Sequence, residues 1–326
     1  MTAATHIEGE TMKKLFAVTV ALALLSLGNI AQANITIETV AIGDTGNVAD
    51  TAAHSGNSAG QGSVGYNYNI GKYEVTAGQY TAFLNAKANI SDTYGLYNTS
   101  MWSNSYGCKI QQTSISGGFS YSVAADYANR AVNYVSYWDS LRFTNWLGNG
   151  QGASSTETGA YTLNGYMGYD GRTISRNTGA TWAVTSEDEW YKAAYYKSGT
   201  YSLYANGTSV APVAGTASNY NMAIGHTWDG TINGALEQNG TKDMMGNVWE
   251  WNEAIVYQDA NYAYRGLRGG SFYSDYLNLQ SSIRNCDPSG EIIFIGFRVS
   301  QIPEPSSIIA LLGGLAGLIG LRRCKA

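Results

Sequence analysis

The chain is organised around the stretch Asp243–Trp251, which reads DMMGNVWEW. Gly246 and Asn247 both tolerate a positive φ angle, so together they predict a tight turn. Side chains alternate along the extended segment that follows, which places Trp249 and Trp251 on the same face. Two indole rings on one face indicate a strand that builds the core of the domain.

Asp243 and Glu250 place one carboxylate on each side of this turn. Carboxylate and backbone carbonyl oxygens together form a ligand set of the kind that Ca²⁺ prefers. The alternative interpretation is a turn that carries two solvated acids. The spacing of the residues leaves both interpretations open.

Residues 1–33 have the features of a secretory signal peptide. A positively charged start at Met12 is followed by the apolar segment Leu15–Leu27. Ala31–Ala33 then provides a small-residue cleavage site, so cleavage is expected before Asn34. We therefore expect translation to start at Met12 and the protein to be exported.

The last residues, 302–326, form a second candidate signal. Pro303–Pro305 precedes the apolar run Ile308–Leu321, and Arg322 and Arg323 follow that run. The run is short for a transmembrane helix, which needs about 20 residues, but the arginines after it fit the positive-inside pattern.

This tripartite tail resembles the PEP-CTERM sorting signal of Gram-negative bacteria. The resemblance implies an exosortase-type processing enzyme as a partner and transient membrane anchoring through the C-terminal helix. It also implies a final location at the cell surface or in the extracellular matrix.

The part between these signals, residues 34–301, is rich in glycine and aromatic residues. The chain has 39 Gly, 25 Tyr and 8 Trp, and charged residues make up only 13% of it. This composition favours a loop-rich fold with little long helix. The net charge of -5 excludes the basic surface of a nucleic-acid-binding protein.

Cysteine and histidine are both scarce. Cys108 and Cys286 lie in the domain, and Cys324 lies in the C-terminal signal. An oxidising compartment would allow Cys108 and Cys286 to form a disulfide, and the sequence leaves that pairing open. His54 and His226 follow the expected cleavage site and are too few for a three-histidine metal centre.

Three short helices are expected from capping boxes. In each box a Ser or Thr precedes a Gln, Asp or Glu by three residues, which satisfies free N–H groups of the first helical turn. The boxes begin at Thr76, Ser136 and Ser186. The second and third helices are expected to end near Leu147 and Lys197.

Strands and long loops account for the remaining residues. Strands are expected over 35–40, 64–70, 268–272, 281–285 and 295–300. Long loops are expected over 96–133, 148–180 and 201–242. Loops of this length are unusual unless they are functional or closely packed. The pattern as a whole indicates an irregular α+β domain.

Three arginines, Arg268, Arg284 and Arg298, lie in otherwise apolar strand segments. We expect them to pair with acids and so to connect the strands. The alternative is a group of three arginines that binds a ligand.

Six segments in order resemble the motifs of the sulfatase-modifying factor family, which includes the formylglycine-generating enzymes. They are Ile70–Thr76, Val135–Asp139, Val184–Trp190, Asp243–Trp251, Arg268–Ser271 and Gly296–Arg298. The third segment lacks the usual arginine-leucine-proline lead-in. The resemblance covers about residues 40–300, so we assign 34–301 to one such domain. It implies an irregular C-type-lectin-like α+β fold with bound calcium.

Carried over to this sequence, one calcium site of the family would use the side chains of Asp243 and Glu250. The carbonyl groups of Gly246 and Val248 would complete it. A second calcium site would lie in the preceding loop, where its ligands are not assigned. Candidates there are Asn219, Asn221 and Asp229.

The sequence departs from the family at the residues that carry its oxidase chemistry. That chemistry uses copper held by two cysteine thiolates, because soft thiolates select Cu(I). The corresponding positions here are Ser274 and Leu279. A hydroxyl and an isobutyl group cannot replace two thiolates, so we expect neither copper nor a catalytic residue.

Two hypotheses of function follow. The first is a non-catalytic surface module whose tyrosine-rich loops bind exopolysaccharide or other surface proteins in a biofilm. The second is a diverged oxidoreductase of the formylglycine-generating type that acts on a protein or small-molecule thiol. Such an enzyme would hold its metal elsewhere, with Cys286 as the candidate position. The sequence favours the first.

Overall fold

The computed structural model describes residues 34–51 and 59–302. The expected signal peptide, His54 and residues 303–326 of the expected sorting signal lie outside the described residues. Within the described ranges, no helix combines the length and apolar character needed to cross a membrane.

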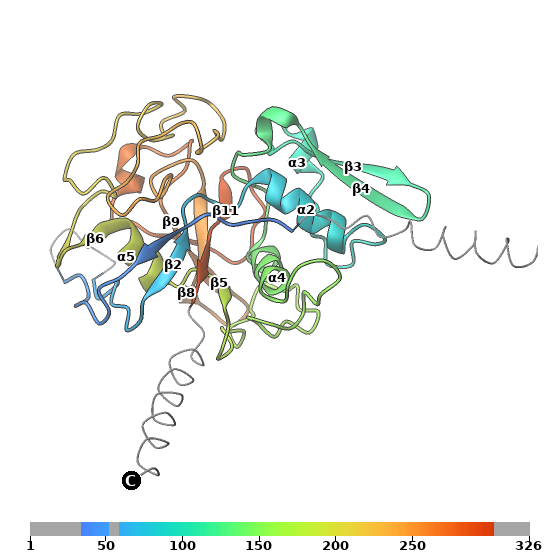
Figure 1. The fold of residues 1–326 in the computed structure, drawn as a ribbon, viewed down its shortest axis with the longest axis horizontal. Coiled ribbons are helices and arrows are strands. Elements are labelled where there is room, and N and C mark those ends of the chain that lie inside the picture. Colours follow the sequence, from blue (N-terminus) through green and yellow to red (C-terminus); the bar gives the residue numbers. More distant parts are fainter. Residues whose placement is uncertain (1–33, 52–58, 303–326) are drawn as a thin grey trace, which may run out of the picture. The chain divides into compact units, whose positions relative to one another are not determined.

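Two four-stranded sheets organise the fold (Figure 1). The first has the order β1 (Thr39–Ile42), β2 (Tyr68–Gly71), β12 (Val299–Gln301) and β5 (Trp182–Val184). All of its strand pairs are antiparallel. The second has the order β10 (Asn285–Asp287), β9 (Ala263–Arg268), β8 (Trp249–Gln258) and β11 (Ile295–Phe297). In this sheet β11 pairs with β8 in parallel, while the other pairs are antiparallel.

The expected closing strand over 295–300 is divided between the two sheets. β11 ends at Phe297 and β12 begins at Val299, so the chain crosses from one sheet to the other at Arg298. β12 then lies between β2 and β5, where it joins the beginning of the domain to its end.

The three expected helices are confirmed. They are α2 (Ala77–Lys87), α4 (Tyr137–Gly148) and α5 (Glu187–Tyr195). Both hydrogen bonds of the capping box are present at each N-terminus. The third helix ends two residues earlier than expected, because the chain enters the short strand β6 (Tyr196–Lys197), which pairs with β7 (Thr200–Tyr201).

Three expectations about strands and loops are wrong. The loop expected over 96–133 contains the hairpin of β3 (Ile110–Ile115) and β4 (Gly118–Val123). It also contains the helical turns α3 (Ser100–Ser103) and η2 (Ala125–Tyr127). The strand expected over 268–272 ends at Arg268. Gly269 and Gly270 adopt φ angles of 97° and 75°, which are not those of a strand, so the chain leaves the sheet there. The strand expected over 281–285 begins only at Asn285.

The core consists of two clusters of buried side chains. The first is dominated by aromatic rings of α2, α4, β8 and β11, and it includes Trp249 and Trp251 as expected. In the second cluster, Trp190 of α5 packs with Met244 and Met245, which precede the turn of the central stretch. The observed fold is therefore an irregular α+β fold of short strands, short helices and long loops.

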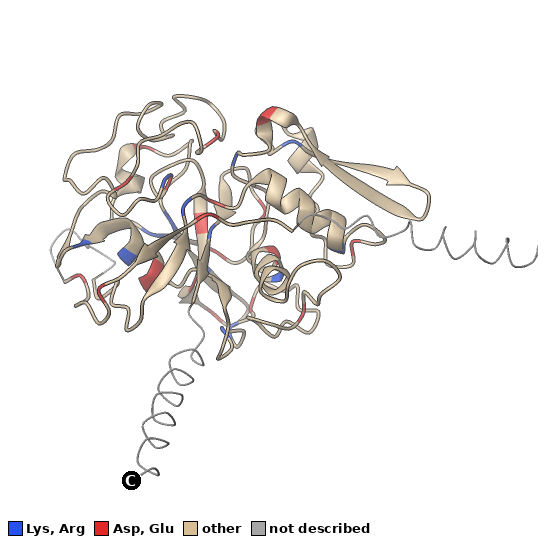
Figure 2. Ribbon diagram, viewed as in Figure 1, with Lys and Arg blue, Asp and Glu red and all other residues tan. Residues whose placement is uncertain are grey.

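Charged residues are few and are scattered over many elements (Figure 2). In the described residues the ribbon shows no continuous basic stretch of the kind that binds nucleic acid.

The turn of the central stretch forms as expected. Gly246 and Asn247 have φ angles of 87° and 58°, both in the left-handed region. A Cβ atom added to Gly246 would lie 2.3 Å from the carbonyl oxygen of Asn219. Only glycine therefore combines this backbone conformation with this close approach.

We expect Gly246→Ala to destabilise the domain by about 1–3 kcal/mol beyond the effect of its positive φ angle alone, because the methyl group meets a backbone oxygen. Gly199→Ala is the matched control, since Gly199 also has a φ angle of 87° but has open space around the added Cβ. Chemical denaturation of both variants checks this. Equal losses of stability would show that the close approach to Asn219 costs nothing.

Candidate functional site

Glu250 of β8 and Arg298, at the crossing between the sheets, form a fully buried ion pair. The Glu250 carboxylate accepts hydrogen bonds from Nε and Nη2 of Arg298, both at 2.6 Å. Nε1 of Trp190 donates to the same carboxylate at 2.7 Å. Arg298 also donates to the carbonyl groups of Gly71 and Lys242, at 2.8 and 3.0 Å. The guanidinium of Arg298 thus connects both sheets with the segment that leads into the turn, and Trp190 of α5 joins them through Glu250.

Three other buried acids interact electrostatically with this ion pair. Burial, together with the charges of Asp243 and Glu250, raises the pKa of Glu74 well above its ordinary value. Burial also raises the pKa of Glu237 and that of Asp243 to about 7. Because Arg298 neutralises Glu250, the remaining carboxyl groups retain protons near neutral pH or require a cation.

Asp243 is the acid whose hydrogen bonding is incomplete. Its Oδ1 accepts a hydrogen bond from Nε1 of Trp228 at 2.8 Å. Its Oδ2 is buried and has no hydrogen-bond partner. Such an oxygen suits a cation ligand.

Glu250 does not suit the calcium site implied by the family resemblance. Both of its oxygens already accept hydrogen bonds, and a bound Ca²⁺ would lie next to the positive charge of Arg298. Among the described residues, no group of three or more His, Cys, Asp or Glu side chains is placed to hold a metal ion. Asp243 thus keeps one oxygen without a hydrogen bond, whereas both oxygens of Glu250 are paired with Arg298, and calcium binding stays a prediction.

The three candidates for a second calcium site make separate contacts. Nδ2 of Asn219 donates to Asn247 at 3.1 Å, which supports the central turn. The backbone N–H of Asn221 donates to the carbonyl group of Ser274 at 2.7 Å. Oδ1 of Asp229 accepts hydrogen bonds from the backbone and hydroxyl of Thr231. Oδ1 of Asn219 is buried and has no hydrogen-bond partner, whereas Asp229 is bonded within its own loop, and the second site remains unassigned.

The other two arginines of the strands also pair with an acid. Arg268 forms a buried ion pair with Glu187, the first residue of α5. Arg284 lies 4.0 Å from the same carboxylate. The expectation that these arginines connect the strands to acids is confirmed, and the alternative of a ligand-binding group of three is wrong.

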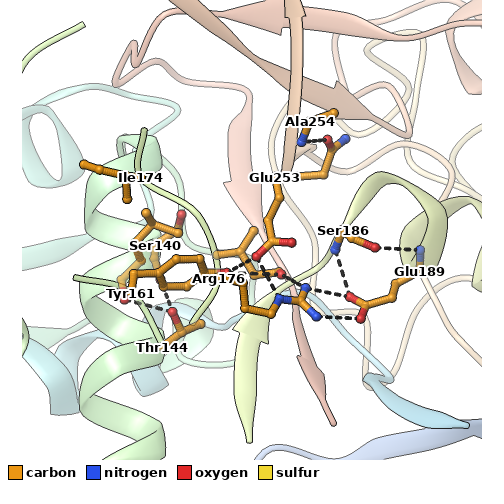
Figure 3. A network of polar contacts seen from close by, with 12 residues as sticks. Ser140, Thr144, Tyr161, Ile174, Arg176, Ser186, Glu189, Glu253 and Ala254 are labelled. Carbon is orange, nitrogen blue, oxygen red and sulfur yellow. Dashed lines mark hydrogen bonds and ion pairs between the residues drawn. The ribbon is translucent and has the colours of Figure 1, made fainter. Parts of the chain in front are cut away.

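A polar network that the sequence did not indicate is centred on Arg176 (Figure 3). Arg176 donates to both oxygens of Glu189 at 2.7 and 2.9 Å, to Glu253 at 2.8 Å and to the carbonyl group of Val184 at 2.9 Å. Burial alone would raise the pKa of Glu189, but the hydrogen bonds from Arg176 hold it below its ordinary value. Tyr161 donates its hydroxyl proton to Glu253.

Arg176 belongs to the expected loop 148–180, which has few charged residues. Its guanidinium binds the helix whose family motif lacks the arginine-leucine-proline lead-in.

The positions that correspond to the family's copper ligands contain no replacement ligand pair. The hydroxyl oxygen of Ser274 lies 3.1 Å from that of Ser271. It also accepts a hydrogen bond from the backbone N–H of Ser271 at 3.0 Å. Leu279, the last residue of η3 (Tyr276–Leu279), is fully buried in the second core cluster. One position therefore stabilises a turn, and the other fills the core.

Both cysteines of the domain are free thiols, so the disulfide that the sequence left open is not formed here. Burial raises the pKa of the Cys108 thiol to about 11 and also raises that of Cys286. Neither environment favours the thiolate form that a soft metal or a nucleophilic reaction needs.

His226 lines a cavity of about 330 Å³ beside Arg130 and Trp228. Nη1 of Arg130 lies 2.9 Å from Nδ1 of His226 and also donates to the carbonyl group of Thr227. Nδ1 of His226 lies 2.8 Å from the same carbonyl oxygen, so both Arg130 and His226 face it. The exposed side chain of Ile232 lies at the rim of this cavity.

The arrangement of short strands, short helices and long loops is that of the formylglycine-generating-enzyme-like fold. The sequence profile of the sulfatase-modifying factor enzyme 1-like domain matches residues 31–301. The chain belongs to this family.

The solved structures that match this chain are distant from it in sequence. Treponema denticola variable protein 1 is 16% identical with a TM-score of 0.54, and the match covers 82% of this chain and 96% of that one. CarF is 19% identical with a TM-score of 0.51, and the match covers 82% and 99%. PvdO from Pseudomonas aeruginosa is 18% identical with a TM-score of 0.44, and the match covers 81% and 92%. No curated protein sequence matches the chain.

The buried acids make stability depend on pH. The folded-state pKa of Asp243, about 7, is above its ordinary value of 3.8, so the unfolded chain releases this proton first. The contribution of Asp243 to stability is then greatest below about pH 4 and is lost as pH rises towards about 7. In the presence of a chelator we expect the melting temperature to fall between pH 5 and 7.5, and to fall less for Asp243→Asn, as measured by calorimetry.

Asp126→Asn is the control for this prediction, because the side chain of Asp126 is 72% exposed. It should keep the pH slope of the unmodified protein. An unchanged slope in Asp243→Asn would mean that Asp243 does not retain its proton in the folded state.

Proposed function

We propose that this chain is an exported, non-catalytic binding module of the cell surface or extracellular matrix, and that it contacts exopolysaccharide or other surface proteins. The observation that carries the proposal is the pair Ser274 and Leu279. A hydrogen-bonded hydroxyl and a buried isobutyl group occupy the positions where the family's oxidases hold copper.

The surface around Ser274 is suited to recognition. We define the Tyr273 surface by its exposed members, which are Tyr106, Met222, Ile224, Tyr273, Tyr276 and Leu277. The segments that carry them are joined, because Met222 N–H donates to the carbonyl group of Phe272 at 2.7 Å. The ring of Tyr106 stacks on that of Phe272, with 6.1 Å between centroids. Exposed aromatic and apolar side chains that gather in this way favour a binding surface.

Export and sorting rest on the sequence patterns at the two ends of the chain. The charged start, apolar segment and small-residue site of residues 1–33 support passage across a membrane. The PEP-CTERM-like order of residues 302–326 supports an exosortase-type partner and a transient membrane anchor. Polysaccharide is then the ligand class that a tyrosine-rich surface in a matrix would meet.

We expect the intact protein to co-sediment with matrix polysaccharide isolated from the organism that encodes it. Tyr273→Ala together with Tyr276→Ala should weaken this binding about tenfold or more, because stacking surfaces are lost. Tyr257→Ala is the control, since Tyr257 is a similarly exposed tyrosine on β8. If the changes at Tyr273 and Tyr276 left binding unaffected, the Tyr273 surface would be excluded as the polysaccharide-binding site.

The alternative oxidoreductase would need a metal beside Cys286. The half-buried thiol of Cys286 has a raised pKa, and Cys108 is buried as a separate free thiol. Stoichiometric copper in the purified protein, with oxygen consumed on a cysteine-containing peptide, would overturn the proposal of a non-catalytic module.

Structural calcium is a further part of the proposal, and the unpartnered Oδ2 of Asp243 supports it. We expect calcium to raise the melting temperature of the unmodified protein above that in chelator, and to have no such effect on Asp243→Asn. Glu38→Gln, which changes an exposed acid, should respond like the unmodified protein. Equal melting temperatures with calcium and with chelator would show that calcium does not stabilise the folded protein.

A further inference from the structure

The hairpin of β3 and β4 stands apart from the two larger sheets. Its strands pair only with each other in the part of the chain that the structure describes, and Figure 1 shows the hairpin pointing away from the sheets. Its register places Ser114 opposite Phe119 and Gln112 opposite Tyr121. A two-stranded sheet has two outer edges, and each needs hydrogen-bond partners for its backbone groups.

The outer edge of β4 is closed by α2 and the loop that follows it. The backbone N–H of Phe119 donates to the carbonyl group of Asn89 at 2.6 Å. The side chain of Asn85 accepts from the backbone N–H of Tyr121 at 2.9 Å and donates to its carbonyl group at 2.8 Å. Because these backbone groups point out of the hairpin, Phe119 and Tyr121 belong to the non-hydrogen-bonded pairs of the ladder.

The outer edge of β3 is open beyond its first residues. Ser114 and Gln112, as partners in those pairs, also direct their backbone groups outward. The hydroxyl of Tyr97 donates to the carbonyl group of Ile110 at 3.1 Å and accepts from the N–H of Gln112 at 3.4 Å. Past this point, the outward backbone groups of Ser114 bond to no described residue, and Ser114 is exposed. We call the segment Gln112–Ile115 the β3 edge.

The β3 edge lacks the features that normally keep a strand edge from pairing with another chain. Such features are charged side chains, proline and bulges. The segment Ile110–Val123 contains neither a charged residue nor a proline, and the register of the hairpin has no shift. By contrast β10, at an edge of the second sheet, contains Asp287 and directly follows Arg284. The open edge of the hairpin is therefore suited to strand addition.

Charge favours a second copy of this chain as the added strand. The chain carries a net charge of -5, so contact between two copies costs least where the meeting surfaces are uncharged. The β3 edge is such a surface. Two antiparallel strands related by a two-fold axis present the same donors and acceptors to each other, so this edge is complementary to itself.

The pairing fits best with the two-fold axis at Ser114. The N–H and carbonyl groups of Ser114 then bond to those of Ser114 in the second copy, and Ile115 lies opposite Thr113 of that copy. Ile115 is 53% exposed and Ile90 is 74% exposed. Both lie next to Gly118, which pairs with Ile115 and whose added Cβ would be 3.0 Å from the Cα of Ile90. Association would cover part of this apolar surface.

We propose that two copies of this chain associate through the β3 edge, which forms a four-stranded antiparallel sheet from two hairpins. The hydrogen bonds of Tyr97 to β3 are kept in this arrangement. The association goes beyond the proposed function, because it needs no polysaccharide and uses no residue of the Tyr273 surface. It would give the module two copies of that surface in one particle.

The test is sedimentation of the full chain in a mild detergent, which covers the apolar run Ile308–Leu321. We expect the mass of the protein component to rise from monomer to dimer as concentration increases. Ser114→Lys should weaken dimer formation at least about tenfold, because two like charges would then face each other across the axis. Ser114→Pro should do the same by removing the outward N–H, which the hairpin itself does not use.

Ser122→Lys is the matched control, since Ser122 is an exposed serine on β4 of the same hairpin. It should dimerise like the unmodified protein, and its melting temperature should equal that of Ser114→Lys. Hydrogen exchange at the amide of Ser114 should slow as the unmodified protein is concentrated. A monomer at all concentrations up to about 1 mM, or a dimer that Ser114→Lys and Ser114→Pro leave intact, would overturn the proposal.

Discussion

The ion pair between Glu250 and Arg298 is the interaction on which the rest of the structure depends. Arg298 lies where the chain leaves one sheet and enters the other, and its guanidinium binds the carboxylate of β8 and the carbonyl groups of Gly71 and Lys242. A fully buried arginine is tolerated only when every one of these partners is in place. The Glu250–Arg298 pair therefore ties the two sheets to the segment before the central turn and, through Trp190, to α5.

The same principle recurs elsewhere in the domain. Arg268 joins β9 to Glu187 of α5, and Arg176 joins a long loop to Glu189 of that helix. In a fold with short strands and little regular hydrogen bonding, buried guanidinium groups take over part of the connecting role of longer sheets. Ser274 and Leu279 take no part in these ion pairs, so the connections between sheets and helices do not depend on which residues occupy those two positions.

Local patterns in the sequence predicted local structure well. Capping boxes located all three principal helices, and Gly246 and Asn247 located the central turn, because both signals depend only on neighbouring residues. The calcium ligand set was harder to predict. Spacing brought Asp243 and Glu250 to one turn, but only the fold shows that Arg298, far along the chain, already occupies Glu250. Arg176 was missed because no local pattern marks its partners, although Glu189 follows it by only 13 residues and Glu253 by 77.

The position of β12 has a consequence for how the chain reaches its folded state. Val299–Gln301 lies between β2 and β5, so the first sheet has a gap until the last strand of the domain is present. Contacts between such distant parts of a chain form slowly. A polypeptide that crossed a membrane from its N-terminus onward would leave this sheet incomplete until Val299–Gln301 had crossed.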